Sequence, residues 1–600
     1  MKHLGMPVLA LPAMLLSVVA PASADSVSIF QRAIFYNGLL EFSDCAPMTI
    51  NGRVHANGPI YTGSPSPLVF NDTVTTASAL SSPAWDGYPQ SDWTATVTFN
   101  GGLFTNVPPI LLTIGTNFHM LIDQPPAGEN PNSTPGNLRL YNQAQILLLV
   151  SNSSVTLRIQ ASPDSQSVPG ADPAPTNIVI NYNATNQSPT NFANLTTNFP
   201  FLSITNTFTD QREDFDNLLV TQIDVGKYAQ WLQTNPEVLA KFPAGSGAWP
   251  TILYVADNRP TDVTQLTAVR LTNGIAPAAN GGLGFTVATP NPLYVIGNYN
   301  CTNAAYLDTT NTSATVPCAL MSDALTVLSQ NWQDGLSGGL YGNRNACSTT
   351  INAAILTGNV PSTGSANTNF SGGVHNLPRL LEDWTGAALI LNTSLVNLYA
   401  SLVATNQFRM PGCYYEPPTR VFSFDPNFNN PSRQPPGAPC LIENPPVITQ
   451  QPQSQAVNAG ATVVLSVAVS NLSFMSLQWS FDGTPMASCT NASLTIQNVQ
   501  TNQAGAYSVV MVDQTTGLTT GSSNAFLAVY ATAAATLGGL SFSAGQQPQF
   551  GVAGVPGLTY VVLGSSDLID WEPLATNLAP FVFAETNLFP QRFYRAVWVP

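Results

Sequence analysis

The chain has 600 residues, too many for one hydrophobic core, and this length predicts three or four domains. Only 8% of the residues are charged and the formal net charge is −15, which argues against nucleic acid and anionic lipid as partners because clustered Lys and Arg bind phosphate groups. Hydrophobic residues make up 44% of the chain and indicate packed cores. The 49 prolines and many β-branched residues are typical of an extracellular β-rich protein.

Residues 1–24 have the pattern of a cleavable signal peptide. A short basic start precedes an apolar run from Met6 to Ala20, and Ala22-Ser23-Ala24 is a small-residue cleavage motif. An uncleaved anchor is the alternative, but the apolar run is shorter than a membrane span. We therefore expect an exported mature chain, without a membrane span, that is extracellular or on the cell surface.

Residues 25–440 are expected to form one large, mainly β domain with a solenoid-like or meander-like course. In NGRVHANGPIYTG (residues 51–63), Val54 and Ile60 alternate with Asn-Gly turns, which suits short stacked strands. The runs ILYVADNRP and NPLYVIGNYN are continuous and apolar, and we expect them to form strands that are buried on both faces.

Two short amphipathic helices are expected to dock on this domain. Both have apolar residues at the i, i+3, i+4, i+7 spacing of one helix face. The first would be capped by Asp224 and present Val225, Tyr228, Ala229 and Leu232. The second would present Leu377, Leu380, Leu381 and Trp384.

Seven cysteines in an exported chain suggest disulfide bonds. Two pairs each flank a polar loop and are the possible disulfides: Cys301 with Cys318, and Cys413 with Cys440. Cys45, Cys347 and Cys489 are left over. Because no CxxC motif occurs, the sequence does not predict a zinc or redox site, and we expect no metal and no cofactor.

No catalytic constellation is visible in the sequence. GLSGG (residues 335–339) fits G-x-S-x-G around Ser337, but the polar segment LYGNRN follows it where a nucleophile elbow needs a helix, so a glycine-rich turn is the favoured interpretation. His55, His119 and His375 are isolated, and we interpret them as structural or surface residues.

Two acidic clusters have structural interpretations. Glu213, Asp214 and Asp216 lie beside Arg212, where a solvated, self-paired loop is favoured over a calcium loop because no EF-hand spacing is present. Glu382 and Asp383 would be adjacent on a helix and point apart, which is poor geometry for an acid/base pair. Carboxylates assembled from distant positions stay an open alternative.

Several stretches of residues 25–440 resemble large surface proteins associated with type IV pilus assembly, of the minor-pilin-like kind. They are FQRAIFYNGLLEF with NGRVHANGPIYTG, FTDQREDFDNLLVTQIDVGKYAQWL, NPLYVIGNYN, SGGVHNLPRLLEDWTG, and PPTRVFSFDPNF with PPGAP. The resemblance implies a surface role. Pilin-like members begin with a long apolar helix that bears an acidic residue, whereas a cleavable signal stands in its place here.

Residues 441–530 comprise a Pro-rich linker and a module with short alternating strands. This module resembles an immunoglobulin-like domain of the intermediate set, and the matching positions are Gly460, Leu465, Trp479, Leu494, Ile496, Gly505 and Tyr507. The resemblance implies that Tyr507 is the corner tyrosine. Val467 and Val509 stand where the family has two bridged cysteines, and we expect them to fill the space around Trp479 by packing.

Residues 531–600 are expected to form a small C-terminal β-sandwich. The segment resembles modules at the ends of large secreted bacterial proteins, and the match lies at Tyr560, Asp567, Leu568, Trp571, Phe593, Tyr594 and Arg595. This resemblance implies a structural or export-related role.

Together these features predict a secreted or cell-surface structural or adhesive protein, multidomain and mainly β, that acts through surfaces rather than by catalysis. Its expected partners are other surface or pilus proteins or glycans. The alternatives are an extracellular polysaccharide-acting enzyme and a carbohydrate-binding protein on a β-solenoid. A groove with carboxylates and stacked aromatic rings would favour an enzyme, and coplanar exposed Trp or Tyr rings would favour carbohydrate binding.

Overall fold

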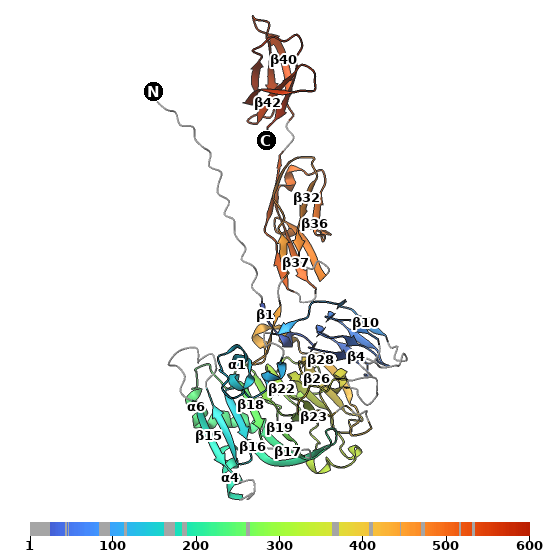
Figure 1. The fold of residues 1–600 in the computed structure, drawn as a ribbon, viewed down its shortest axis with the longest axis vertical. Helices are drawn as coiled ribbons and strands as arrows, with labels where there is room; N and C mark the ends of the chain where they lie inside the picture. The colour runs from blue at the N-terminus through green and yellow to red at the C-terminus, as the bar shows by residue number, and fades with distance from the viewer. Residues whose placement is uncertain are drawn as a thin grey trace. The chain divides into compact units, whose positions relative to one another are not determined.

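The computed structural model divides the chain into two compact units, residues 24–443 and a unit containing residues 444–600 (Figure 1). It describes residues 25–42, 45, 47–82, 96–112, 117–160, 175–182, 189–259, 265–362, 371, 373–406, 408, 412–443, 446–469, 474–514, 518–530 and 534–599. The expected signal peptide, residues 1–24, lies outside the described residues. Among the described residues, no helix is both long and apolar enough to cross a membrane.

The N-terminal domain is a parallel β-solenoid, which settles the solenoid-or-meander alternative. Its largest sheet has 12 strands. In spatial order they are β11 (Leu103–Thr105), β8 (Val74–Thr76), β5 (Val54–Ala56), β2 (Ile34–Tyr36), β27 (Leu395–Asn397), β25 (Ala354–Thr357), β22 (Cys318–Ser322), β20 (Phe285–Thr289), β18 (Ile252–Asp257), β13 (Ile146–Val150), β14 (Ser154–Ile159) and β15 (Thr176–Asn181).

Smaller sheets form the other sides of the solenoid. One runs β16 (Leu202–Asp210), β17 (Phe215–Asp224), β19 (Thr267–Thr272), β21 (Leu293–Ile296), β23 (Leu325–Leu328), and another β24 (Thr349–Asn352), β26 (Ala388–Thr393), β28 (Thr419–Phe424). Two more run β10 (Val97–Phe99), β7 (Leu68–Phe70), β4 (Met48–Ile50) and β3 (Leu40–Glu41), β6 (Ile60–Tyr61), β9 (Leu80–Ser81). Finally, β29 (Cys440–Glu443) pairs antiparallel with both β1 (Asp25–Ser28) and β12 (Leu111–Leu112). The solenoid therefore extends to residue 443, three residues beyond the predicted boundary at 440.

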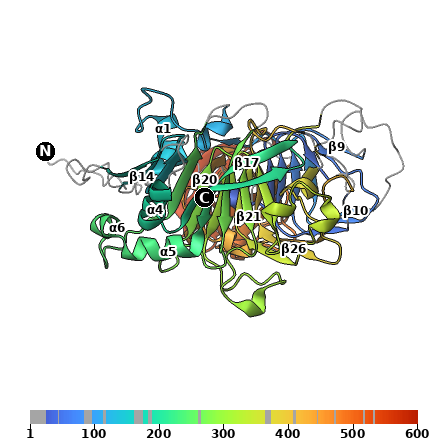
Figure 2. The ribbon, with the colours of Figure 1, turned by 90° about the horizontal axis from the view of Figure 1, so that it is seen from below.

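The order of strands in the long sheet is permuted relative to the chain. The first rungs run from β2 outward to β11, and the chain then crosses to β13 near the other end. It continues through β14 to the end strand β15 and then returns from β18 to β27. There β2 pairs in parallel with β27. In Figure 2 the rungs of β9 and β10 lie at the opposite end from α4 (Pro189–Asn198), α5 (Val225–Thr234) and α6 (Pro236–Lys241). We call the β2–β27 junction the seam.

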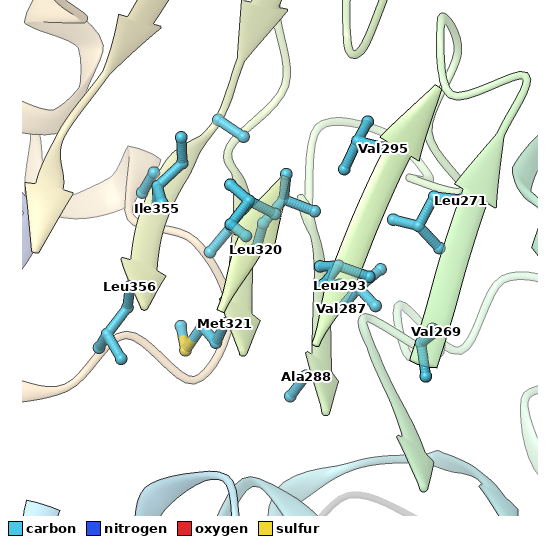
Figure 3. Close-up of a cluster of buried hydrophobic side chains, with 14 of the residues drawn as sticks. Val269, Leu271, Val287, Ala288, Leu293, Val295, Leu320, Met321, Ile355 and Leu356 are labelled. Carbon is cyan, nitrogen blue, oxygen red and sulfur yellow. The ribbon is translucent and has the colours of Figure 1, made fainter. Parts of the chain in front are cut away.

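The sequence forms rungs because apolar residues fill the interior and small or amide residues fill the corners. Val269 and Leu293, from adjacent strands of one sheet, and Leu320 and Ile355, from adjacent strands of the 12-stranded sheet, are all fully buried and belong to the same apolar core (Figure 3). At one corner an asparagine ladder continues between rungs, since the side-chain amide of Asn71 donates to Asn51 at 2.8 Å and that of Asn100 donates to Asn71 at 2.8 Å.

Helices are few in the described part of this domain. The remaining ones are α1 (Thr134–Leu138) and α2 (Leu140–Gln143), in the crossing segment. The expected helix after Asp224 is α5: the Asp224 carboxylate accepts the Lys227 amide at 2.9 Å, and Val225, Tyr228 and Leu232 are buried.

The prediction of a second helix, with Leu377, Leu380, Leu381 and Trp384 on one face, is wrong. Residues 377–384 form bends and bridges after a short 3-10 turn at Gly373–Asn376, although Leu377, Leu380, Leu381 and Trp384 are all buried. Their backbone instead joins the rungs: Arg379 exchanges hydrogen bonds with Leu325 and Val327, and Asp383 bridges to Asn345. Pro378 also removes an N–H that a helix would use, so tertiary ladder bonding prevails over the helical spacing.

The second unit begins with a β-sandwich. One sheet contains β31 (Gln455–Asn458), β39 (Ala525–Tyr530), β37 (Gly505–Asp513), β34 (Met475–Phe481) and β35 (Thr484–Pro485), with β38 (Thr519–Gly521) beside β37. The opposing pairs are β32 (Val463–Ser466) with β36 (Ser493–Ile496), and β30 (Ile448–Gln450) with β33 (Ala468–Val469).

The core of this sandwich has the expected residues. Trp479 and Val509 are fully buried and Val467 is 6% exposed, and they belong to one apolar cluster. The Tyr507 hydroxyl donates to the Gln503 carbonyl at 2.9 Å, which is the tyrosine-corner bond. Gly505 packs tightly, since a Cβ there would lie 2.6 Å from the Phe481 ring.

The last module packs two three-stranded sheets on a small core. They run β40 (Thr536–Phe542), β41 (Pro548–Ala553), β44 (Phe581–Ala584) and β43 (Glu572–Leu578), β42 (Thr559–Ser565), β45 (Phe593–Trp598). The Asp567 carboxylate accepts the amides of Ile569 and Asp570 and closes a turn, while the Arg595 guanidinium lies 4.2 Å from the ring centre of Trp571. These resemblance residues therefore have structural roles.

Candidate binding groove

A surface groove of about 770 Å³ lies on the solenoid. Three segments form its walls: the end of β16 with the following turn, the loop 338–341, and the loop 412–414. Its lining residues are Thr209, Gln211, Asp214, Gly338, Gly339, Leu340, Tyr341, Gly412, Cys413 and Tyr414.

One buried arginine holds these walls together. Arg344 is 4% exposed, and its Nε donates to the Leu381 carbonyl at 2.8 Å. Its Nη1 donates to the carbonyls of Ser337 and Gly339, and its Nη2 donates to the Gln211 side chain and the Tyr414 carbonyl, all at 2.7–2.9 Å. Burial lowers the pKa of Arg344. The N–H groups of the Arg344 guanidinium are thus occupied by hydrogen bonds that hold the groove walls in place.

The turn 211–214 rests on a buried ionic network. Glu213 is 2% exposed, lies 2.7 Å from Arg379 Nη1 and accepts the amide of Asn406 at 2.9 Å. Burial raises the pKa of Glu213, although Arg379 opposes the shift. Arg212 is also buried and donates to the Asn376 side chain at 3.0 Å. The expectation of a solvated loop is thus wrong for Arg212 and Glu213, and holds only for the exposed Asp214; the side chain of Asp216 lies outside the described residues.

The groove lining is mostly polar, with one large apolar side chain at its rim. Leu340 is 79% exposed, and the half-buried Tyr341 donates its hydroxyl to Glu416 Oε1 at 3.0 Å. This hydrogen bond raises the pKa of the Tyr341 hydroxyl. Among the described lining residues, Asp214 is the only carboxylate and none is Lys or Arg. The described lining therefore offers an anionic ligand no cationic side chain.

The residues weighed as catalytic have structural surroundings. Ser337 follows the turn Asp334–Leu336, and its Oγ donates to the Asp334 carbonyl at 2.6 Å and accepts the Thr209 amide at 2.9 Å. This confirms the glycine-rich turn. Glu382 is fully buried and accepts the Ser329 hydroxyl at 2.7 Å, and burial raises its pKa to about 7.

The histidines lie apart from one another. His55 is fully buried, with its ring nitrogens 2.7 Å from Thr75 Oγ1 and 2.8 Å from Asn57 Oδ1. His119 lies between Asp123 and Asp323, at 2.7 and 3.1 Å. The side chain of His375 lies outside the described residues.

Neither expected disulfide is present in the structure. Cys301, Cys318, Cys413 and Cys440 are free thiols. Cys318 begins β22 and is fully buried, Cys301 directs its sulfur toward the Asn303 carbonyl at 3.6 Å, and Cys413 is exposed in the groove. Burial raises the pKa of Cys301 and of Cys318, so these two thiols stay protonated at neutral pH.

Arg344, the exposed Leu340 and the half-buried Tyr341 were not predicted from the sequence. The signal was present but unspecific: in a chain with 8% charged residues, an arginine inside the Gly- and Asn-rich run LYGNRN stands out. Its five acceptors come from residues 211, 337, 339, 381 and 414. Local spacing cannot reveal such a set.

One family model matches part of the second unit. Residues 445–512 match the family model described as an immunoglobulin domain. The chain is similar to the tandem Ig repeats of Dlar (23% identity, 14% of this chain and 48% of that chain, TM-score 0.13). It is also similar to a chimeric titin Z1Z2 carrying a peptide from decorin (26%, 14% and 96%, TM-score 0.13) and to the titin M3 domain (21%, 14% and 95%, TM-score 0.13).

The chain thus spans about half the length of the Dlar repeats, and no curated protein matches it. None of the matches reported above supports the resemblance of residues 25–440 to pilus-associated proteins. The family match and the strand arrangement together show an immunoglobulin-like sandwich in a mainly β, multidomain chain. Such a sandwich indicates a structural or interaction role for this part of the chain.

Proposed function

We propose that the protein is an exported structural or adhesive protein whose solenoid binds a neutral polysaccharide in the groove. The carrying observation is the exposed Leu340 beside the half-buried Tyr341 in a groove whose described lining has no Lys or Arg. An aromatic ring beside neutral hydrogen-bonding groups suits the face of an uncharged sugar ring.

The rigidity of the groove supports binding. Because Arg344 fixes the carbonyls of Ser337, Gly339 and Tyr414, the loops lose little conformational entropy when a ligand binds. The second unit is proposed to act as a spacer, which suits an immunoglobulin-like module of structural character.

The groove supports binding better than hydrolysis. Hydrolysis of a glycosidic bond commonly needs two carboxyl groups that flank the bond. Among the described lining residues Asp214 is the only carboxylate, and Glu416 is engaged by the Tyr341 hydroxyl.

Co-sedimentation of the mature chain with insoluble neutral polysaccharides tests the proposal. We expect Leu340→Ala combined with Tyr341→Ala to weaken binding at least about tenfold, as expected for the loss of two central contacts. The matched control is Leu402→Ala, since Leu402 is also exposed, at 65%, but does not line the groove. Equal binding by the double variant and the wild type would refute the site, and binding only to basic peptides would refute the ligand class.

The resemblance to pilus-associated proteins motivates a finer proposal, that the chain is carried on surface fibres. Mechanical shearing of cells followed by immunodetection tests this point separately. The mature chain should be recovered with the sheared fibres. Recovery of all of the chain in the unsheared medium would reject a place on fibres and leave the groove proposal intact.

A further inference from the structure

A small polar pocket of about 170 Å³ lies at the seam of the solenoid. Asn37 and Glu41 reach it from the first rungs, and the remaining polar lining side chains come from the returning part of the chain. These are Asn359, Ser362, Ser371, Asn397 and Tyr399. The pocket thus lies where β2 meets β27 and is separate from the groove.

Glu41 is the feature of this pocket that needs an explanation. Its side chain is 2% exposed. Its Oε2 accepts the hydroxyls of Ser362 and Ser371, at 2.9 and 2.5 Å. Its Oε1 is buried and has no hydrogen-bond partner among the described residues.

The carboxyl group also has no cationic partner in the described part of the chain. No ion pair joins it to Lys, Arg or His there, and the nearby titratable group is the buried Tyr36 hydroxyl. Burying a carboxylate without compensation is costly. Burial accordingly raises the pKa of Glu41 to about 7, although the two serine hydroxyls oppose the shift.

We infer that the seam pocket binds a calcium ion, with Glu41 as its charged ligand and neutral side-chain oxygens of the pocket as the others. Ca²⁺ takes six to eight oxygen ligands in flexible geometry, whereas Mg²⁺ demands a near-ideal octahedron. Amide and hydroxyl oxygens of Asn359, Ser362, Ser371 and Asn397 are of the accepted kind. A single carboxylate predicts weak binding, with half-saturation on the order of 1 mM, as in extracellular calcium modules.

The ion would hold together two parts of the solenoid that are distant in sequence. Glu41 belongs to β3, while Ser362 and Ser371 are 321 and 330 residues away along the chain. Because the ion binds the folded seam and not the unfolded chain, it raises the stability of the solenoid with concentration.

Thermal unfolding of the full mature chain at pH 8, with calcium chloride or with chelator, tests the site. We expect Ca²⁺ to raise the unfolding midpoint of the wild type and to leave that of Glu41→Gln unchanged. Glu382→Gln is the matched control, because Glu382 is also buried but hydrogen-bonds Ser329 and does not line the pocket. It should keep the calcium response. No calcium response in the wild type, or an equal response in Glu41→Gln, would overturn the inference and show that Glu41 binds only a proton.

Terbium luminescence provides a second readout that does not depend on stability. Tyr399 lines the pocket and can transfer excitation energy to a bound Tb³⁺. Emission should appear with the wild type, be displaced by Ca²⁺, and be lost in Glu41→Gln. Emission retained in Glu41→Gln would place the ion elsewhere. Polysaccharide binding by Glu41→Gln separates this inference from the groove proposal, since either can fail while the other holds.

Discussion

Arg344 Nη2 donates a hydrogen bond of 2.9 Å to the carbonyl oxygen of Tyr414, across 70 residues of sequence. The same guanidinium holds the carbonyls of Ser337, Gly339 and Leu381. Arg344→Ala should therefore lower the free energy of unfolding of the solenoid by more than about 3 kcal/mol, because several buried carbonyls lose their donor.

Urea unfolding followed by circular dichroism measures this loss. Arg433→Ala is the control, since Arg433 makes one described hydrogen bond, from Nη2 to the Thr315 carbonyl at 2.8 Å. Its cost should be about 1 kcal/mol. Equal losses for the two variants would contradict the central role of Arg344.

Close packing of the rungs at Gly58 gives a second prediction. A Cβ at Gly58 would lie 2.6 Å from the backbone carbon of Gly38, whereas a Cβ at Gly38 would meet nothing within 4 Å. Gly58→Ala should lower the thermal midpoint of the solenoid and reduce its free energy of unfolding by roughly 1–3 kcal/mol. Gly38→Ala should have little effect, and a larger loss there would show that the rungs do not pack as described.

The stability of the solenoid should fall at alkaline pH because of His119. Burial alone would lower the pKa of His119, but the hydrogen bonds and charges of Asp123 and Asp323 outweigh it and raise the pKa to about 9. A raised pKa means that the folded state binds the proton more tightly than the unfolded state. The stabilisation is complete below pH about 6.5 and is lost as pH rises through about 9.

Urea unfolding between pH 6 and pH 10 measures this dependence. His119→Gln should be less stable than the wild type at neutral pH and should lack the decline attributed to His119. The same alkaline decline in His119→Gln would assign the effect to another group.

The tyrosine corner predicts a local effect in the immunoglobulin-like domain. Tyr507→Phe removes the hydroxyl that donates to the Gln503 carbonyl and should reduce the free energy of unfolding of that domain by about 1 kcal/mol. Tyr530→Phe is the control, because Tyr530 is 40% exposed. A neutral Tyr507→Phe would indicate that packing of the ring, not the hydroxyl, carries the contribution.

Features with a local signature were predictable from the sequence. The Asn-Gly turns around Val54 and Ile60 predicted short stacked strands, and Asp224 predicted the start of a helix. The positions around Trp479 and Tyr507 predicted the immunoglobulin-like sandwich. The helix predicted for Leu377 to Trp384 was wrong, because buried positions in a rung can have the same spacing as one face of a helix. Pro378, which lacks the N–H that a helix would use, argued against a helix there. The permuted rung order, and the partners of Arg344, Glu213 and Glu41, depend on contacts between residues far apart in sequence, which no local pattern encodes.

Hydrogen–deuterium exchange of the full mature chain, with and without a bound neutral polysaccharide, tests the groove most directly. We expect slower exchange in the loops 338–341 and 412–414 and unchanged exchange in the second unit. Protection confined to the second unit, or release of reducing sugar ends during the incubation, would contradict a binding groove on the solenoid.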